Sequence, residues 1–498
     1  MGNKLPFILS FGLYGCMIAV IAAVATRYTK NLSDYLLGGR RLSGPVTALA
    51  AGASDMSGWL LMALPGLIYV KGLEASWITL ALVLGAFLNW KFVATRLRIY
   101  TEIAKDSLTL PAFFVNRFED NQQYLRSVTS ATILIFFTFY SVASFNSGAL
   151  LLQSIFSIDY FVALLIIASS IVLYTAIGGF IAVSWVDCFQ GLLIFVSLIT
   201  VPVVTIVFLG GYYNTVYEIN KFNIDFLALF ANLKPLTLLS LAAWGLGYFG
   251  QPHILARFMA IRNHKELGVA TKICITWMSL SLGGAVVTGL VGVVFFLSQP
   301  LEKPDTVFIV LAQTLFRPWI AGILISAVLS AIMSAVSSQI LMSASILVED
   351  FYKGYFRKKA SNREYMWAGR VLLVVIAAIT IILASNQHAS IFQSVGFAWS
   401  GLGASFGPIT LFSLYWPRTN KYGAIAGIVS GALMVLAWGL LSKYFSFLAH
   451  PDLFSGIEIL PAFIVSSLAI VITSLLTSVP SSSMLKGFQA MKDKLVAP

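Results

Sequence analysis

Apolar runs about as long as a membrane is thick recur along almost the whole of this sequence. A helix needs about 20 mainly apolar residues to cross the hydrocarbon core of a bilayer, and 58% of the 498 residues are hydrophobic whereas 10% are charged. We therefore expect an all-α membrane protein with about 13 transmembrane helices. The expected spans are residues 6–25, 46–70, 75–93, 127–156, 160–177, 185–209, 236–250, 273–297, 309–342, 368–384, 391–415, 424–441 and 459–476.

Two of these runs have unusual lengths. The run 236–250 is short for a complete span, and 309–342 is too long for a simple one, so we expect it to contain a bend or a separate extracellular helix. The first run, 6–25, has neither a basic leader nor a small-residue cleavage motif, and we expect it to be a span and not a cleavable signal peptide.

The charged residues predict how the chain is oriented. A net charge of +12 would suit a nucleic-acid partner, but the Lys and Arg residues gather in alternate loops, which is the positive-inside pattern of inner-membrane proteins. The basic loops contain Arg27 to Arg41, Arg96 to Arg126, Arg257 to Lys265, Lys353 to Arg370, and Arg418 with Lys421, and the tail holds Lys486 to Lys494. We expect the N-terminus outside, the C-terminus in the cytoplasm and no nucleic-acid partner.

No loop is long enough to hold a catalytic domain, and the tail at 477–498 is a short Ser-rich piece. The three Cys and four His residues are dispersed without metal-ligand spacing. We expect no enzymatic activity, no cofactor and no obligatory protein partner. Membrane lipid is the expected surrounding. Function must then be built from the helices.

Small and polar residues interrupt two of the apolar runs. Ala51–Trp59 contains two glycines, two serines and an aspartate, and Trp244–His253 contains three glycines and a proline. Unwound helices at corresponding positions of two halves mark transporter sites, because they expose backbone carbonyls to a cation and helix ends to a charged substrate. Close helix packing also explains either glycine cluster alone, but the pairing favours a site.

The two interrupted runs lie five segments apart, so we expect two five-helix repeats. Because five is odd, the repeats must have opposite orientation in the membrane. The predicted divisions are 1–45 for the first helix and a cytoplasmic loop, 46–209 and 236–415 for the repeats, 416–476 for two additional helices, and 477–498 for the cytoplasmic tail.

Two acidic residues and a row of serines lie within the apolar runs. Asp55 falls inside the first break and Asp187 near the start of the sixth run, and intramembrane acids are usually functional. Asp187 is close enough to a boundary for a helix-capping or surface role. The ninth run carries a stripe of hydroxyls, which a hard cation such as sodium could use as ligands or which only allow close packing. Its members are Ser326, Ser330, Ser334, Ser337 and Ser338.

Four aromatic residues lie in or near the breaks: Trp59, Tyr140, Trp244 and Tyr248. Aromatic faces suit a small apolar ring and stabilise an ammonium group by cation–π attraction. Most aromatic residues fill cores and interfaces, so only the position of these four beside the breaks favours a substrate site.

Four motifs resemble the solute:sodium symporter family over nearly the whole chain. They are SDYLLGGR at Ser33–Arg40, AGASDMSGWLLM at Ala51–Met62, GGFIAVSWVD at Gly178–Asp187 and WGLGYFGQPHILARFM at Trp244–Met259. The glycine-rich pieces are general to the family, whereas the last is more specific to its proline carriers. The resemblance implies a leucine-transporter-like fold of two inverted five-helix repeats and sodium-coupled uptake of L-proline by alternating access.

The resemblance also implies the ligands of the coupling ion. The main sodium site would use the carbonyls of Ala53, Met56 and Ala331 and the hydroxyl of Ser334. The family normally has a second hydroxyl where this sequence has Ala335. Some relatives have a further site, which Asp187, Ser334, Ser337 and Ser338 match here, and our hypothesis is that this set holds the cation partly or mainly, in compensation for Ala335.

The proline pocket that the resemblance implies consists of Trp59, Tyr140, Trp244, Tyr248 and Pro252, with Arg40 and Asp55 as polar positions near the ion path. Three alternatives stay open. The solute is another small amino acid or a carboxylate, the coupling ion is a proton, or the chain is a transport-like sensor or channel.

Overall fold

The computed structural model describes residues 4–230, 233–385, 391–444 and 457–496. Over these residues the fold is helical without a β-strand, and Leu42 and Ile261 form an isolated bridge between two loops. The all-α prediction is therefore confirmed.

The α-helices are α1 (Leu5–Thr26), α2 (Leu32–Leu37), α3 (Gly44–Met56), α4 (Leu64–Lys71), α5 (Trp77–Asn89), α6 (Thr95–Ile103), α7 (Leu110–Arg117), α8 (Tyr124–Phe156), α9 (Tyr160–Phe208), α10 (Tyr212–Phe222), α11 (Pro235–Ala243), α12 (Pro252–Ala260), α13 (Leu267–Phe295), α14 (Val307–Leu315), α15 (Pro318–Ile346), α16 (Asn362–Ala384), α17 (Ile391–Tyr415), α18 (Lys421–Tyr444), α19 (Ile459–Leu476) and α20 (Ser482–Val496). Short 3₁₀ or π turns are η1 (Gly38–Arg40), η2 (Trp59–Ala63), η3 (Leu73–Ser76), η4 (Trp90–Ala94), η5 (Ile224–Leu227), η6 (Trp244–Gly250), η7 (His264–Glu266), η8 (Pro304–Thr306) and η9 (Leu347–Phe356).

The number of spans agrees with the sequence once broken helices are counted. Among the described residues, 10 helices are long and apolar enough to cross a membrane, and the bent pair Gly44–Met56 and Trp59–Lys71 brings the number to 11. α9 has 49 residues, which if straight would span about 74 Å. Gly179 divides it at a φ of 61°, a backbone conformation that glycine adopts readily. That division and the interrupted α11–η6–α12 segment account for the remaining expected spans.

The long run at 309–342 separates into α14 and α15, so the expected separate helix is present. α15 is the most enclosed of the spanning helices: 89% of an apolar stretch of 18 residues is buried. It packs against α1, α3, α8 and α9. Side chains on α15 therefore face protein on nearly every side, and its serines have little contact with lipid.

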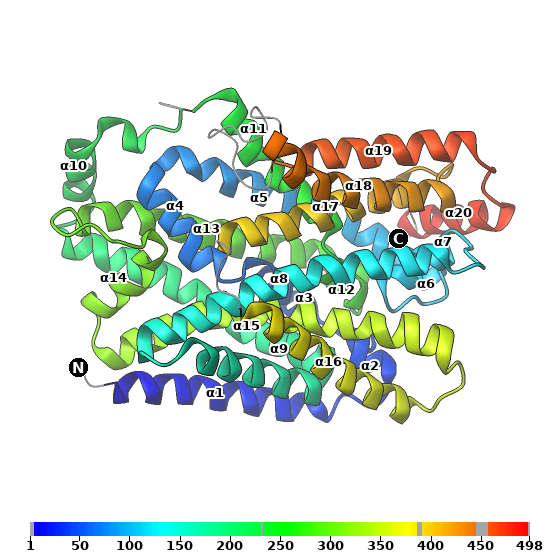
Figure 1. Ribbon diagram of the computed structural model, residues 1–498, viewed down its shortest axis with the longest axis horizontal. Helices are drawn as coiled ribbons and strands as arrows, with labels where there is room; N and C mark the ends of the chain where they lie inside the picture. The colour runs from blue at the N-terminus through cyan, green and yellow to red at the C-terminus, as the bar shows by residue number, and fades with distance from the viewer. Residues whose placement is uncertain (1–3, 231–232, 386–390, 445–456, 497–498) are drawn as a thin grey trace.

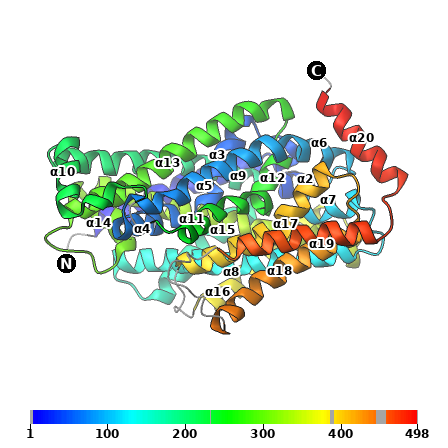
Figure 2. The same ribbon diagram turned by 90° about the horizontal axis from the view of Figure 1, so that it is seen from above.

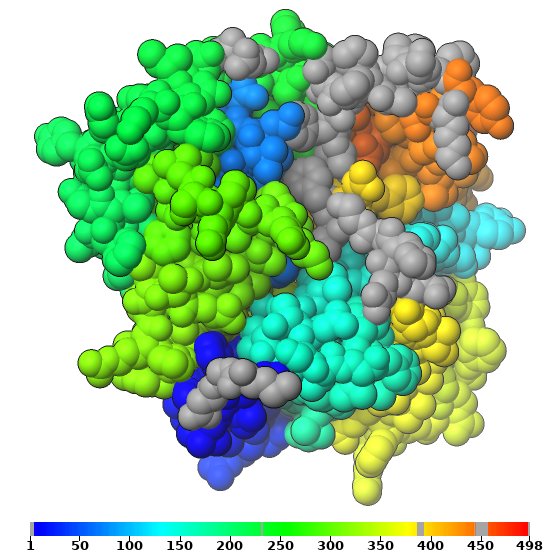
Figure 3. All heavy atoms as spheres, turned by 60° about the vertical axis from the view of Figure 1, so that its left-hand side comes forward, coloured from blue at the N-terminus to red at the C-terminus, as the bar shows by residue number. Residues whose placement is uncertain are grey.

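The axes of most long helices are roughly aligned, so the molecule is a bundle with two ends (Figure 1). α1 begins at the end where α10 and α14 lie, whereas α2, α6, α7 and α20 lie at the other (Figure 2). Figure 3 looks onto the end where α1 begins. A cavity of about 740 Å³ between α4, α8 and α14 lies at this end.

Candidate functional site

The first predicted break is present at the end of α3. The helix ends at Met56, Ser57 has a positive φ of 39°, and the chain continues at 64° to α3 through η2 into α4. The last four carbonyls of a helix have no partner within the helix. The carbonyls of Ala53 and Met56 therefore lie at the interrupted end of α3, in the middle of the bent span. Both α3 and η2 pack against α15 at this point.

The second predicted break lies between α11 and α12. Trp244–Gly250 forms a 3₁₀ segment, Gln251 is extended, and Pro252 begins α12. Pro at the first position of a helix sacrifices no hydrogen bond. The side-chain amide of Gln251 donates to the carbonyls of Gly247 (3.2 Å) and Trp399 (3.1 Å), and these bonds hold the unwound segment against α17.

The two breaks meet through their aromatic side chains. The rings of Trp59 and Trp244 stack with centroids 6.0 Å apart and planes at 25°. The Tyr248 hydroxyl donates a short hydrogen bond to Asp55 Oδ2, and the Tyr140 hydroxyl lies 3.5 Å from the Asp55 carbonyl oxygen. Residues nearly 200 positions apart in sequence therefore form one cluster, as the pairing of the breaks predicted.

A small cavity of about 20 Å³ lies within this cluster, which is room for about one water molecule. Its lining consists of Asp55, Met56, Ser57, Trp59, Leu82, Tyr140, Trp244, Tyr248, Val395 and Trp399. Four of the five aromatic or cyclic residues of the predicted pocket line it, and Pro252 does not. The rings nearly fill the space, so the cavity in this structure is too small for a solute larger than a water molecule.

Trp399 of α17 was missed by the sequence analysis. Its indole N–H donates to the Trp244 carbonyl over 2.9 Å, and its ring meets that of Tyr248 edge-on at 5.1 Å. The 391–415 run has no break to draw attention to this residue. The sequence signal was a tryptophan beside Ser400-Gly401, in a span that contains three further glycines.

Two buried polar atoms of the lining have no hydrogen-bond partner among the described residues. They are Asp55 Oδ1, an acceptor, and Trp59 Nε1, a donor. Unpaired buried polar atoms are costly, so this pair indicates a place where a charged or polar ligand completes the bonding.

Asp187, the second acidic residue, lies on α9 and is fully buried. Its Oδ2 forms an ion pair of 2.6 Å with Arg257 Nη2, and its Oδ1 accepts a bond of 2.6 Å from the Ser334 hydroxyl. The sequence analysis counted Arg257 in a basic loop, and this was wrong: α12 extends through it, and its side chain is 1% exposed. Loop residues and buried helix residues are not distinguished by charge pattern alone.

The serine stripe divides into two kinds of hydroxyl. Ser326, Ser330 and Ser337 donate to carbonyls of α15 itself, as serines in closely packed helices do. Ser334 and Ser338 instead reach Asp187, at 2.6 and 3.5 Å. Ala335, also buried, supplies no side-chain oxygen.

Arg40 ends η1, the turn that directly follows α2, and lies apart from the breaks. Its guanidinium binds Asp106 Oδ1 (2.7 Å), the Met259 carbonyl (2.6 Å) and the Ser107 carbonyl (3.0 Å). Burial lowers the pKa of Arg40, and Asp106 opposes that effect. The residue therefore ties the end of α12 to the segment between α6 and α7.

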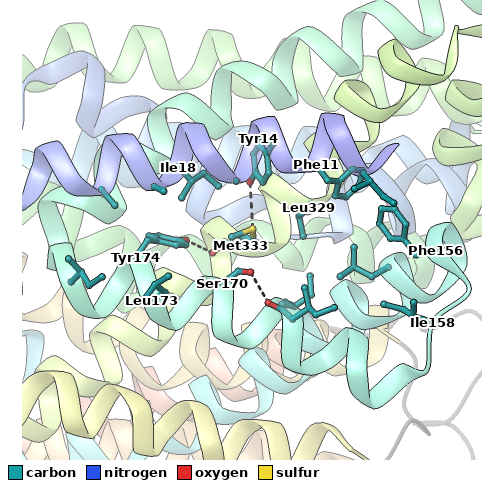
Figure 4. A pocket seen from close by; sticks show the side chains of 18 of the residues that line it. Phe11, Tyr14, Ile18, Phe156, Ile158, Ser170, Leu173, Tyr174, Leu329 and Met333 are labelled. Carbon is teal, nitrogen blue, oxygen red and sulfur yellow. Dashed lines mark hydrogen bonds between the residues drawn. The ribbon is translucent and has the colours of Figure 1, made fainter. Parts of the chain in front are cut away.

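A larger groove of about 650 Å³ lies between α1, α8, α9 and α15 (Figure 4). Apolar side chains such as Ile18, Leu173 and Leu329 line it, and Tyr14 and Tyr174 bind Met333 at its floor. Because it offers few polar groups, the groove suits lipid chains and not a zwitterionic solute.

Comparison with known proteins decides the family. The Sodium:solute symporter family matches residues 35–431. The chain belongs to this family. Sodium/proline symporters of Haemophilus influenzae and Escherichia coli are each 46% identical to it, covering 97% of both chains in the first case and 98% of this chain and 96% of the relative in the second. The high-affinity proline transporter PutP of Bacillus subtilis is 45% identical, covering 96% of this chain and 99% of the relative.

Two solved transporter structures share the fold of this symporter. A sodium-coupled sialic acid symporter in a substrate-bound outward-open state superposes with a TM-score of 0.81 at 16% identity, covering 96% of this chain and 99% of that one. Mhp1, a nucleobase-cation-symport-1 transporter in a closed conformation, gives a TM-score of 0.54 at 12% identity, covering 93% and 99%. The expected leucine-transporter-like fold is confirmed, and this family member is a membrane transporter and not an enzyme.

Proposed function

We propose that this symporter takes up L-proline with sodium by alternating access. The relatives named above as sodium/proline symporters support the solute and the ion. The two breaks, which meet at one cluster, support a central binding site between two inverted repeats, with the predicted divisions at 46–209 and 236–415.

The unpaired donor and acceptor in the aromatic cavity carry the proposal. An amino-acid carboxylate accepts from Trp59 Nε1, and Asp55 Oδ1 faces the positive charge of the bound pair, either sodium or the secondary ammonium. The faces of Trp244 and Tyr248 contact the pyrrolidine ring and its ammonium. Tyr140 closes the pocket on the α8 side, and Pro252 acts indirectly by ending the unwound segment.

We propose that sodium binds where α3 unwinds beside α15. The ligands are the carbonyls of Ala53, Met56 and Ala331 and the hydroxyl of Ser334. The second predicted set is the Asp187 carboxylate with the hydroxyls of Ser334, Ser337 and Ser338. We place Arg40 at the inner end of the ion path. Its role there is to tie α12 to the segment after α6.

Sodium at the end of α3 orders the break near Asp55, so proline binds better when the ion is present. Such coupling is a free energy shared by both ligands and is necessarily reciprocal. The 740 Å³ cavity between α4, α8 and α14 adjoins η2 through Met62 and Ala63. We assign it as the outer vestibule, in a multi-pass protein of the inner membrane with its N-terminus outside.

Uptake of radiolabelled proline into proteoliposomes tests this function, with sodium, lithium or proton gradients imposed separately. We expect concentrative uptake under an inward sodium gradient, and counterflow when proline is preloaded. Uptake that follows the proton gradient and ignores sodium would contradict the ion. Stronger competition by another amino acid or a carboxylate would contradict the solute, and equilibration without concentration would indicate a channel.

A further inference from the structure

Arg257 occupies the position that a cation would take beside Asp187. Its Nη2 lies 2.6 Å from Asp187 Oδ2 and 2.8 Å from Ser338 Oγ, and its Nη1 lies 2.8 Å from Ser184 Oγ. Two of these partners, Asp187 and Ser338, belong to the second predicted sodium set. The guanidinium therefore uses the same oxygen atoms that a sodium ion would need.

The surroundings hold this guanidinium firmly. Its Cζ lies 4.5 Å from the centroid of the Phe180 ring, which is cation–π distance. Phe180 directly follows the kink at Gly179, so the division of α9 places both Phe180 and Ser184 against Arg257. The side chain is 1% exposed, and a buried charge of this kind depends on protein partners.

The backbone that follows Arg257 is fixed as well. Arg40 donates to the Met259 carbonyl (2.6 Å) and Arg98 to the Ile261 carbonyl (2.6 Å). Leu42 and the segment after α12 exchange two further backbone bonds, from Leu42 N–H to the Ala260 carbonyl and from Arg262 N–H to the Leu42 carbonyl. Withdrawal of the guanidinium would require α12 to move and these bonds to break.

Charge balance distinguishes Asp187 from Asp55, the two buried acids that the sequence places within apolar runs. Asp187 already faces one full positive charge, and a sodium ion added there would place two cations against one carboxylate in a medium of low dielectric constant. Asp55 receives only the Tyr248 hydroxyl, and its Oδ1 has no partner among the described residues. Of these two acids, Asp55 is the one whose negative charge lacks a cationic partner among the described residues.

We propose that Arg257 is the resident cation of the Asp187 site, a tethered guanidinium in place of a second sodium ion. The chain then binds a single sodium ion, at the end of α3. This inference rests on the proposed sodium coupling and deepens it. Asp187, Ser184 and Ser338 act as positioning residues that hold α9, α12 and α15 together through the guanidinium.

Equilibrium binding of ²²Na⁺ to purified protein counts the ions without any need for transport. We expect one ion per protein for the unaltered chain. Arg257→Gln removes the guanidinium and leaves Asp187 uncompensated, so we expect this variant to bind two. The double variant Asp187→Asn with Arg257→Gln removes both charges, and we expect it to return to one ion, with a sodium midpoint within about twofold of the unaltered chain.

Three results would overturn the inference: two ions on the unaltered chain, a folded Arg257→Gln variant that binds one, or a double variant that binds none. Should Arg257→Gln fail to fold, the comparison of the unaltered chain with the charge-neutral double variant decides. Sodium binding without proline uptake in proteoliposomes would contradict the proposed function and leave this count intact, so the two failures are distinguishable.

Discussion

At the scale of single residues, the site depends on bonds between side chains and unwound backbone. Trp399 is an example, because its indole N–H binds the Trp244 carbonyl and its ring contacts Tyr248. It thereby fixes the backbone and one aromatic wall of the cavity in a single contact.

We predict that Trp399→Phe weakens proline binding. The variant keeps an aromatic ring but loses the indole hydrogen bond, whose net contribution is about 0.5–1.5 kcal/mol. We expect the KM for proline to rise about tenfold, with a smaller change in kcat, in sodium-driven uptake. Trp438→Phe, on α18 and partly buried, is the matched control. Equal KM values for the two variants would contradict the role of Trp399.

The sequence predicted residues beside the breaks better than residues brought there by packing. Trp59, Trp244 and Tyr248 follow directly from the interrupted runs, because unwound backbone and its flanking side chains share one location. Trp399 comes from a segment that carries no such mark, and Arg257 follows the second break but was assigned to a loop by its charge. Their roles depend on which helix faces lie against η6 and α9, and that is decided by tertiary contact.

At the scale of helices, close backbone approach holds the second break in place. α5 and η6 pack side by side, and a Cβ added to Gly85 would lie 2.2 Å from the Gly245 carbonyl oxygen. The unwound segment thus rests on α5 without intervening side chains.

We predict that Gly85→Ala displaces η6 and reduces transport. The added methyl group cannot be accommodated by a rotamer change, because it meets backbone, and overpacking of this kind costs about 1–3 kcal/mol. We expect a lower Tm in detergent and at least a severalfold loss of proline uptake. Gly283→Ala on α13 is the matched control, since a Cβ there has nothing within 4 Å. If both variants keep the Tm and the proline uptake of the unaltered chain, the close approach of α5 and η6 is not needed for transport.

Some elements escaped the sequence analysis although a signal existed. The region 477–498 was expected only as a tail, but it contains α20, which packs against α6. Met484, Phe488 and Met491 are its buried residues, and their spacing of four and three positions is that of an amphipathic helix. A search for apolar runs long enough to span a membrane does not detect this shorter amphipathic pattern.

At the scale of the whole molecule, the charge pattern and the fold agree on two distinct ends. The helices within or beside the basic segments, namely α2, α6, α7 and α20, gather at one end, and the N-terminus, α10 and α14 lie at the other (Figures 1 and 2). Positive charge is retained on the cytoplasmic side of a membrane protein. The end that carries α20 should therefore be cytoplasmic.

Cysteine labelling on a background without Cys16, Cys188 and Cys274 tests this orientation. Tyr213 on α10 and Val496 on α20 are 87% and 85% exposed, and these two helices lie at opposite ends of the bundle (Figure 1). In right-side-out vesicles we expect an impermeant maleimide to label Tyr213→Cys at once and Val496→Cys only after permeabilisation. The reverse order would place the basic loops outside, and the 740 Å³ cavity beside η2 would then be the inner and not the outer vestibule.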